Sequence, residues 1–312
     1  MRSVGTVRWE VDDRPQSLYT RLYVLGMRLA RDKQAFEGRR NTLETARRRQ
    51  RSGDKPPTVM TRLLRNVRSE MIGGMRVWLV RPRKRTPVAR VVYVHGGGYV
   101  HPLTKDYWRL VRALSVAPAE VVVPAYPLAP DATVDDVVPR LIEVERRAGS
   151  PTLPTVLIGD SAGGALVVVI ARRILDMGGT GISRVFALCP WLDATLGGPE
   201  VQELESTDPM LAESGIRAAG RWWAGGRSPS DPLVSPLEDS LDGLPPLDVV
   251  IGDRDILRPA VDDLADKAKR SDVDLSVFEA TAMFHVWMTR AIPEGRRMRR
   301  RLTRLVRGSV SR

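Results

Sequence analysis

The order of apolar and polar residues predicts strands that alternate with helices from about residue 65 onward. Short, nearly continuous apolar runs are typical of buried strands, whereas apolar residues three and four apart predict helices. The predicted strands lie at residues 67–72, 75–80, 89–94, 120–125, 155–158, 183–188, 247–251 and 274–279. The predicted helices lie at 104–116, 134–147, 161–177, 259–270 and from about 292. This alternation predicts an α/β fold whose mostly parallel central sheet is covered by helices on both faces.

Two segments depart from this alternation. Residues 15–52 predict one or two helices, with leucines at helical spacing at positions 18, 22, 25 and 29. Residues 191–243 lose the alternation and collect glycine, proline, serine and tryptophan. We therefore expect an N-terminal helical part over residues 1–60 and a core over 61–312, with an inserted segment at 191–230. The adjacent glycines at 73 and 74 predict a tight hairpin between the first two strands.

The composition excludes several classes of protein. The longest apolar run has seven residues, 165–171, whereas a membrane-spanning helix needs about 18. The first residues lack the apolar run of a secretory signal, which favours a cytoplasmic location and leaves peripheral attachment to the membrane or cell envelope open. A single cysteine, Cys189, and three histidines argue against a disulfide-stapled module and against a structural metal site. No metal or organic cofactor is therefore expected.

The net charge of +12 is concentrated in the two flanks of the chain. Residues 1–70 contain 17 Lys and Arg against 8 Asp and Glu, and residues 294–312 contain eight Arg against Glu294. These flanks lack interleaved aromatic residues and any known nucleic-acid module, so nucleic-acid binding is not expected. A weak attraction to an anionic membrane surface is left open. The apolar positions of the arginine-rich segment 296–307 predict a helix packed on the core or on a second copy in a homodimer.

A serine stands where a strand is predicted to turn sharply into a helix, in Gly159-Asp-Ser161-Ala-Gly163. A serine hydroxyl becomes a nucleophile only when it is held in the open beside a base. Small residues two positions on either side allow the tight strand–turn–helix that does this, and the helix start places the N–H of Ala162 near a developing oxyanion. A plain glycine-rich turn with a capping serine is the alternative. We favour Ser161 as a nucleophile because of its context.

Three consecutive glycines follow the predicted strand 89–94, in His95-Gly-Gly-Gly98. Consecutive glycines free backbone N–H groups to point at a ligand. With Ser161 in the same sheet, Gly97 and Gly98 are the expected second and third oxyanion donors. Phosphate binding is the alternative, but the chain lacks both the P-loop pattern and a dinucleotide-binding glycine pattern.

The base is expected to be His285, because it follows the last predicted strand and completes the chain order Ser…Asp…His of sheet hydrolases. A packed or surface histidine is the alternative. The acid that orients this base should follow strand 247–251, where both Asp253 and Asp255 stand. Their spacing does not separate them, because residues two apart can face the same way.

These motifs together resemble those of the hormone-sensitive-lipase family of α/β-hydrolases, which contains bacterial carboxylesterases and lipases. The resemblance covers about residues 75–290 and rests on His95-Gly-Gly-Gly-Tyr99, Tyr126-Pro-Leu-Ala-Pro130, Gly159-Asp-Ser-Ala-Gly-Gly164, Asp255-Ile-Leu-Arg258 and His285-Val-Trp-Met288. It implies that the catalytic acid is Asp255. It also implies a cap built from the N-terminal helices and the insertion at 191–230.

The resemblance further implies a serine carboxylic-ester hydrolase that acts on short-to-medium apolar acyl esters through an acyl-enzyme. An amidase or N-acetyl hydrolase with the same triad is the alternative activity. Tyr99, Trp222 and Trp223 are candidate residues of an apolar substrate pocket, together with Met210 and Leu211. Packing of the cap on the core is the equal alternative for these side chains.

Overall fold

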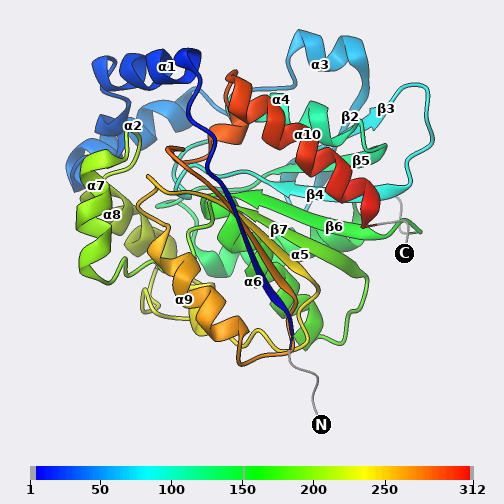
Figure 1. The fold of residues 1–312 in the computed structure, drawn as a ribbon. Helices are drawn as coiled ribbons and strands as arrows, with labels where there is room; N and C mark the ends of the chain where they lie inside the picture. The colour runs from blue at the N-terminus through cyan, green and yellow to red at the C-terminus, as the bar shows by residue number, and fades with distance from the viewer. Residues whose placement is uncertain (1–4, 150–151, 310–312) are drawn as a thin grey trace.

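A computed structural model describes residues 5–149 and 152–309, and a nine-stranded sheet runs through its centre (Figure 1). The strands lie in the order β1-β9-β8-β7-β6-β4-β5-β3-β2. Neighbours from β1 to β5 pair in parallel, whereas β3 pairs antiparallel with both β5 and β2. The prediction of a mostly parallel sheet is therefore confirmed. The strand bounds are β1 Val7–Asp12, β2 Arg65–Ile72, β3 Met75–Pro82, β4 Ala89–Val94, β5 Ala119–Ala125, β6 Thr155–Asp160, β7 Ile182–Leu188, β8 Leu247–Gly252 and β9 Leu275–Ala280.

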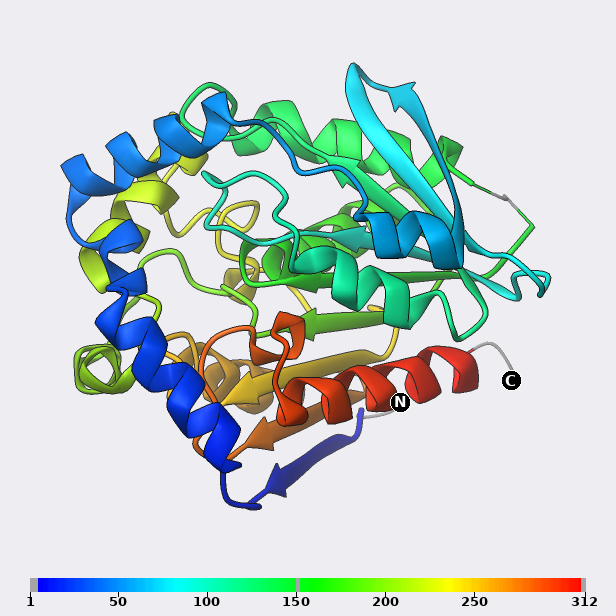
Figure 2. The same ribbon diagram turned by 90° about the horizontal axis from the view of Figure 1, so that it is seen from above.

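Helices cover both faces of this sheet, as the sequence predicts. The helices α4 (Tyr107–Leu114) and α10 (Pro293–Gly308) lie on one face (Figure 2). The helices α5 (Val134–Arg147), α6 (Ala162–Asp176) and α9 (Pro259–Ala268) lie on the other. Right-handed crossovers explain the division, because the chain passes from β4 to β5 in one direction along the sheet and from β5 through β6 to β7 in the other.

The N-terminal part is not wholly helical, which corrects one expectation. Residues Val7–Asp12 form β1, which pairs in parallel with β9 at the edge of the central sheet. The alternation of Val7, Trp9 and Val11 with polar residues is a strand pattern, but the partner strand lies near the other end of the chain. A short helix, α3 (Val59–Leu64), also follows residues 53–58 without having been predicted.

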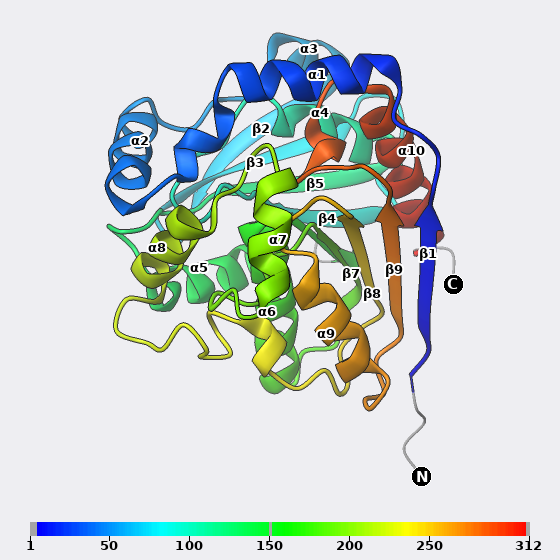
Figure 3. The same cartoon turned by 60° about the vertical axis from the view of Figure 1, so that its left-hand side comes forward.

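Helices from the N-terminal part and from the insertion meet beyond the carboxyl ends of the strands (Figure 3). They are α1 (Leu18–Leu29), the 3-10 helix η1 (Asp32–Phe36), α2 (Arg39–Arg51), α7 (Pro199–Thr207) and α8 (Glu213–Ala224). The backbones of α8 and η1 approach so closely that a Cβ atom on Gly215 would lie 1.9 Å from the carbonyl oxygen of Phe36. The two sequence-distant segments therefore form one packed layer over the sheet.

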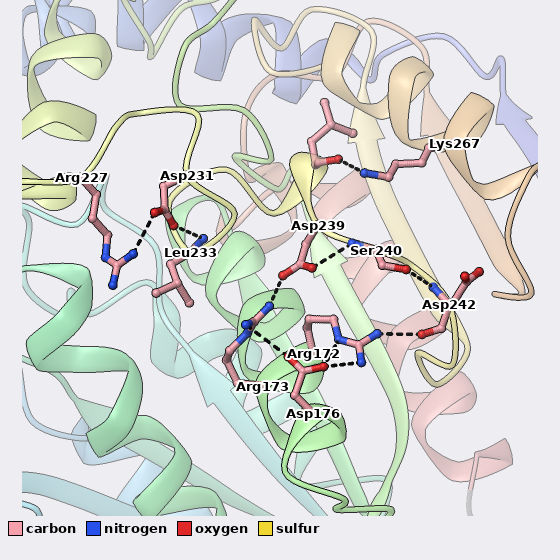
Figure 4. A network of polar contacts seen from close by, with 11 residues as sticks. Arg172, Arg173, Asp176, Arg227, Asp231, Leu233, Asp239, Ser240, Asp242 and Lys267 are labelled. Atoms are coloured by element: carbon pink, nitrogen blue, oxygen red, sulfur yellow. Dashed lines mark hydrogen bonds and ion pairs between the residues drawn. The ribbon is translucent and has the colours of Figure 1, made fainter.

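An irregular segment returns the chain from α8 to β8, and a polar network holds it against α6 (Figure 4). Arg173 on α6 pairs with Asp239, and Arg172 donates to the carbonyl oxygen of Asp242 at 2.7 Å. On the other side, Lys267 of α9 donates to the carbonyl oxygen of Leu237 at 2.6 Å. These contacts give the glycine- and proline-rich stretch a defined path, although its regular secondary structure is confined to the short 3-10 helix η2 (Pro236–Glu238).

The arginine-rich C-terminal helix α10 packs on the core of its own chain. Its apolar residues Met298, Leu302 and Val306 are buried, and α10 contacts α4. The apolar face predicted from the sequence is therefore used within the monomer. In the described part of the chain, every helix is too short or too polar to cross a bilayer.

Candidate active site

Ser161 stands at the turn between β6 and α6 with backbone angles φ 54° and ψ −123°. A positive φ is rare for a residue with a side chain and costs on the order of 1–3 kcal/mol, so the surrounding structure must enforce it. The N–H of Ser161 donates to the carbonyl oxygen of Leu188 at 2.8 Å, and its carbonyl accepts from Trp191 at 3.1 Å. These bonds to the end of β7 hold the serine at the carboxyl edge of the sheet.

The glycines on either side of Ser161 are required by close backbone contacts. A Cβ atom on Gly159 would lie 2.0 Å from the carbonyl oxygen of Gly163, and one on Gly163 would lie 2.1 Å from that of Val94. Both obstacles are backbone atoms, which cannot rotate away as a side chain can. The sequence-based reason for the glycines is therefore confirmed.

We expect Gly163→Ala to lower the free energy of unfolding by about 3 kcal/mol or more, because β4 and the start of α6 must separate to admit the methyl group. Urea unfolding followed by circular dichroism measures this. Gly181→Ala is the matched control, since nothing lies within 4 Å of its Cβ position. Equal stability of the two variants would contradict the close approach.

The glycine loop after β4 lies directly against the serine turn. A Cβ atom on Gly96 would lie 2.8 Å from the Cβ of Ser161. Gly97 and Gly98 have φ values of 104° and 61°, which favour glycine. Within the described part of the chain, the N–H groups of Gly97 and Gly98 donate no hydrogen bond to another backbone group in a turn or loop. They are therefore free to donate to a ligand beside Ser161, as is typical of an oxyanion hole.

The structure brings Ser161, His285 and Asp255 into one hydrogen-bonded chain. The Nε2 of His285 lies 2.8 Å from Ser161 Oγ, and its Nδ1 lies 2.7 Å from Asp255 Oδ2. The other carboxylate oxygen of Asp255 accepts from the N–H of Leu257 at 3.0 Å. All three side chains are buried. Asp255, not Asp253, therefore contacts the imidazole, which is the geometry of a serine nucleophile with its base and orienting acid.

The carboxylates around His285 set its pKa. Burial of the imidazole lowers the pKa, but the charge and hydrogen bond of Asp255, with the charges of Asp208 and Asp160, raise it above its usual value. Burial also raises the pKa of Asp160 to about 6, although its hydrogen bond from Tyr93 opposes this. The site therefore favours a positive charge on His285, which is what accepting a proton from Ser161 creates.

Asp208, between α7 and α8, supports the acid loop and was not predicted from the sequence. Its Oδ2 accepts from the N–H of Ile256 at 3.2 Å, and its Oδ1 accepts from Met210 at 2.7 Å and Leu211 at 3.0 Å. Burial raises the pKa of this carboxyl group to about 6, and the negative charge of Asp255 adds to the effect. No motif marked Asp208, because its role depends on how the insertion folds back onto the core.

Cys189 lies beside the triad but is already used in packing. Its sulfur accepts from the N–H of Val286 at 3.3 Å, and burial raises the pKa of its thiol. Cys189, Asp255 and His285 place potential metal ligands within 4.8 Å of one another. Both ring nitrogens of His285 are hydrogen-bonded, however, so a metal ion would have to displace Asp255 or Ser161 from the imidazole.

A cavity of about 390 Å³ opens in front of Ser161 and His285. Its apolar wall comes from the cap and from the carboxyl edge of the sheet: Ala35, Phe36, Trp191, Met210, Leu211 and Ile216. Gly97 and Gly98 line it, as do the polar residues His101, Arg49 and Arg290. The volume suits a small organic ligand. Ala162 follows Ser161 directly at the buried start of α6.

The predicted pocket residues Tyr99, Trp222 and Trp223 do not line this cavity, which corrects that expectation. Tyr99 is buried and stacks on Trp223 with ring centroids 4.2 Å apart and an interplanar angle of 4°. Trp223 is fully buried, and Trp222 is half-buried against the core. These rings instead pack the cap on the core, which was the alternative prediction. Trp191, whose ring also stacks on Tyr99, lines the cavity instead.

Comparison with known proteins agrees with this geometry. The model of a family with the alpha/beta hydrolase fold matches residues 91–289, so the chain belongs to this family of hydrolases. A crystal structure of an esterase from the bacterial hormone-sensitive-lipase family superposes with a TM-score of 0.79 at 24% identity, covering 96% of this chain and all of that one. The predicted fold and family resemblance are both confirmed.

Relatives of this chain carry names of ester and acetyl hydrolases. An acetyl-hydrolase of Streptomyces hygroscopicus is 28% identical, covering 72% of this chain and 77% of that protein. A carboxylesterase of Mycobacterium tuberculosis is 29% identical, covering 80% and 83%. A triacylglycerol lipase of the same organism is 31% identical over 76% of this chain, which spans only 50% of that lipase. These similarities support carboxylic-ester hydrolysis as the class of reaction.

Proposed function

We propose that the protein is a serine carboxylic-ester hydrolase that works through an acyl-enzyme. The observation that carries this proposal is the hydrogen-bonded chain from Asp255 through His285 to Ser161, which faces a cavity beside free backbone N–H groups. Each part of that arrangement matches a step of acyl transfer.

In the first half of the reaction, Ser161 Oγ attacks the acyl carbon while its proton passes to Nε2 of His285. The carboxylate of Asp255 holds Nδ1–H and stabilises the imidazolium. Negative charge on the acyl oxygen is accepted by the N–H groups of Gly97, Gly98 and Ala162. When the tetrahedral intermediate collapses, the carbon–oxygen bond breaks and the alcohol leaves with the proton from His285.

In the second half, water attacks the acyl-enzyme as His285 removes its proton. The oxyanion forms again at the same N–H groups, and the carboxylic acid is released as Ser161 regains its proton. No further group is needed for this sequence. The apolar part of the wall, which includes Phe36, Met210 and Ile216, supports short-to-medium acyl chains as substrates.

A 4-nitrophenyl ester series from acetate to dodecanoate tests the activity and sizes the cavity. We expect turnover with an optimum at short-to-medium chains, because the cavity volume of about 390 Å³ admits few methylene groups. The series is paired with 4-nitroacetanilide, since relatives named acetyl-hydrolases make amide cleavage the second candidate. Anilide turnover without ester turnover would replace the esterase with an amidase, and turnover of neither by folded protein would overturn both.

The pH dependence should report the raised pKa of His285. A protonated imidazole has no lone pair for the serine proton, so kcat/KM should fall about tenfold per pH unit below that pKa. Because the surrounding carboxylates raise the pKa, the midpoint of the acid limb should lie above the usual histidine value of about 6.5. A pH profile between 5 and 9 measures it, and a midpoint below 6 would contradict the assignment.

A further inference from the structure

We propose that the cavity binds esters that carry a carboxylate away from the scissile bond, held by Arg49, Arg290 and His101. This inference rests on the proposed ester hydrolysis and names its substrate class. The wall of the cavity is shared about equally by polar and apolar atoms, and these three residues bring hydrogen-bond donors to it from separate segments. Several of those donors have no hydrogen-bond partner within the described part of the protein.

Arg49 lies in the last turn of α2 and lines the cavity. Its guanidinium makes none of the ion pairs or hydrogen bonds found in the described part of the chain, whereas Arg40 and Arg47 of the same helix pair with Glu44 and Asp131. Partial burial lowers the pKa of Arg49, and the nearby charge of Arg48 adds to this. An unpaired, partly desolvated guanidinium is the group that a carboxylate binds with two parallel hydrogen bonds.

Arg290 reaches the same cavity from the segment between η3 (Trp287–Thr289) and α10. Its Nη1 donates to Asp106 at 2.9 Å and its Nη2 to Met210 Sδ at 3.7 Å, but its Nε is buried and has no partner. Asp106 is shared, because its other oxygen accepts from Arg109 at 3.0 Å. One carboxylate therefore serves two arginines, and the Nε of Arg290 is left as a free donor at the wall.

His101 adds a third group without a partner. Its side chain is 97% buried against Phe36, lines the cavity, and has no hydrogen-bond partner at Nδ1 or Nε2. Burial and the charge of Arg49 lower the pKa of His101 to about 3, so its ring is neutral and offers one N–H. A buried ring with two unsatisfied nitrogens is costly unless a ligand completes it.

The acidic residues of the cavity do not favour a cationic substrate. Asp160 accepts from Tyr93 through Oδ1, and its Oδ2 lies against Gly96 of the glycine loop without a hydrogen-bond partner. Asp106 is held by the two arginines. Asp32 is exposed to solvent, and its negative charge acts to raise the pKa of Arg49. Away from Asp160 and the triad, Arg49, Arg290 and His101 each offer a donor without a partner, which is the chemistry that recognises a carboxylate.

Three 4-nitrophenyl esters of matched length test the charge preference: hemiglutarate, pentanoate and 4-(trimethylammonio)butanoate. A second pair, 4-acetoxybenzoate and 4-acetoxybenzamide, places the charge on the alcohol side. We expect a higher kcat/KM for the carboxylate ester than for the neutral ester in at least one of two comparisons, hemiglutarate with pentanoate or 4-acetoxybenzoate with 4-acetoxybenzamide. Arg49→Gln should lower the ratio of kcat/KM for the carboxylate ester to kcat/KM for the neutral ester about tenfold, as expected for loss of a charge-assisted pair. Arg51→Gln, on the same helix but outside the cavity, is the control with the same change of net charge.

The outcomes separate this inference from the proposed function. Turnover of pentanoate with no preference for either carboxylate ester, or a preference for the cation, would overturn the inference and leave the esterase standing. If no ester turns over, calorimetry can still test the carboxylate site by measuring how tightly Ser161→Ala binds the intact hemiglutarate ester. Tighter binding than that of pentanoate ester, lost with Arg49→Gln, supports the carboxylate site, and equal binding overturns it.

A second, independent observation concerns the outer face of the cap. Of the 14 large apolar side chains that are exposed in the described residues, nine lie on α1 and α3. They are Leu18, Tyr19, Leu22, Leu25 and Leu29 of α1, and Val59, Met60, Leu63 and Leu64 of α3. Both helices lie at the same outer end of the molecule (Figures 1 and 3). We call these nine residues the cap patch and propose that it docks on an anionic lipid surface.

Charge complementarity favours lipid over a second copy of this chain. Residues 17–64, which contain α1, α2 and α3, carry 12 Lys and Arg against four Asp and Glu. Two such faces would repel each other, whereas anionic headgroups attract them while the leucines enter the acyl boundary. Docking in this way would bring the cavity, lined by Asp32 and Arg49 from the same layer, close to the lipid surface.

Vesicle sedimentation tests the docking with phosphatidylcholine alone and with added phosphatidylglycerol. We expect binding to the anionic vesicles at low salt and an about tenfold loss for Leu22→Glu with Leu25→Glu, since two leucines no longer enter the bilayer. Met71→Glu with Met177→Glu is the control, because these side chains are 63% and 60% exposed outside the cap patch. The proposal would be overturned if the wild type did not bind, or if both variants lost binding equally. It would also be overturned if the wild type were a dimer that Leu22→Glu with Leu25→Glu converts to a monomer.

Discussion

Replacing Ser161 with alanine should lower ester turnover by about 10⁴-fold or more, because water would then have to attack without covalent catalysis. The imidazole of His285 would lose the hydroxyl that lies 2.8 Å away and would have no nucleophile to activate. The N–H groups of Gly97 and Gly98 would remain, so slight activity above background is expected. Steady-state kinetics with the preferred 4-nitrophenyl ester measures the loss.

The fold should survive this change, since only one oxygen atom is removed. Ser183→Ala is the matched control, because its hydroxyl donates to the carbonyl oxygen of Thr155 and lies outside the cavity. A fluorophosphonate probe gives a second readout, with an adduct on the Ser161 peptide of the wild type and none in the variant. Turnover by Ser161→Ala within tenfold of the wild type would show that another residue carries the acyl group.

Replacing Asp255 with asparagine should lower kcat by about 10³–10⁴-fold, as an amide cannot stabilise the imidazolium and can hold the wrong tautomer. The change keeps the size of the side chain at a fully buried position. The remaining acid limb should also move to lower pH, because burial lowers the pKa of His285 once the charge of Asp255 is gone. Kinetics across pH 5–9 measures both effects.

Asp253→Asn provides the comparison, because it makes the same chemical change two residues away. The imidazole of His285 is hydrogen-bonded to Asp255 and not to Asp253, so the Asp253 variant should retain activity within a few-fold of the wild type. An equal loss in both variants would point to distortion of the loop after β8. A loss confined to Asp253→Asn would mean that the orienting acid has been misassigned.

The central sheet could be predicted because its strands are buried runs whose pattern is local. The predicted bounds of β4 and α5 match the structure, whereas α4 begins three residues later than predicted. The strand β1 was missed although its residues alternate in polarity, because it is short and pairs only with β9, far along the chain. An edge strand of this kind is stabilised by its neighbour, and no local pattern identifies that neighbour.

Much of the candidate site could also be predicted from the sequence. The contacts that make Gly159 and Gly163 necessary arise within one strand–turn–helix, so the motif and the geometry carry the same information. The order of Ser161, the aspartates and His285 along parallel strands placed them at one edge of the sheet. Family resemblance then favoured Asp255 over Asp253, and in the structure Asp255 is the residue that is hydrogen-bonded to His285.

What the sequence by itself determined is the set of elements and the local geometry of the serine turn, because both depend on residues close together in the chain. Only the tertiary structure decided how side chains from distant segments are used. It stacks Tyr99 on Trp223 within the core, brings Asp208 to the acid loop, and gathers Arg49 and Arg290 on one cavity. Burial and pairing depend on the neighbours that folding supplies, and those neighbours are not adjacent in the sequence.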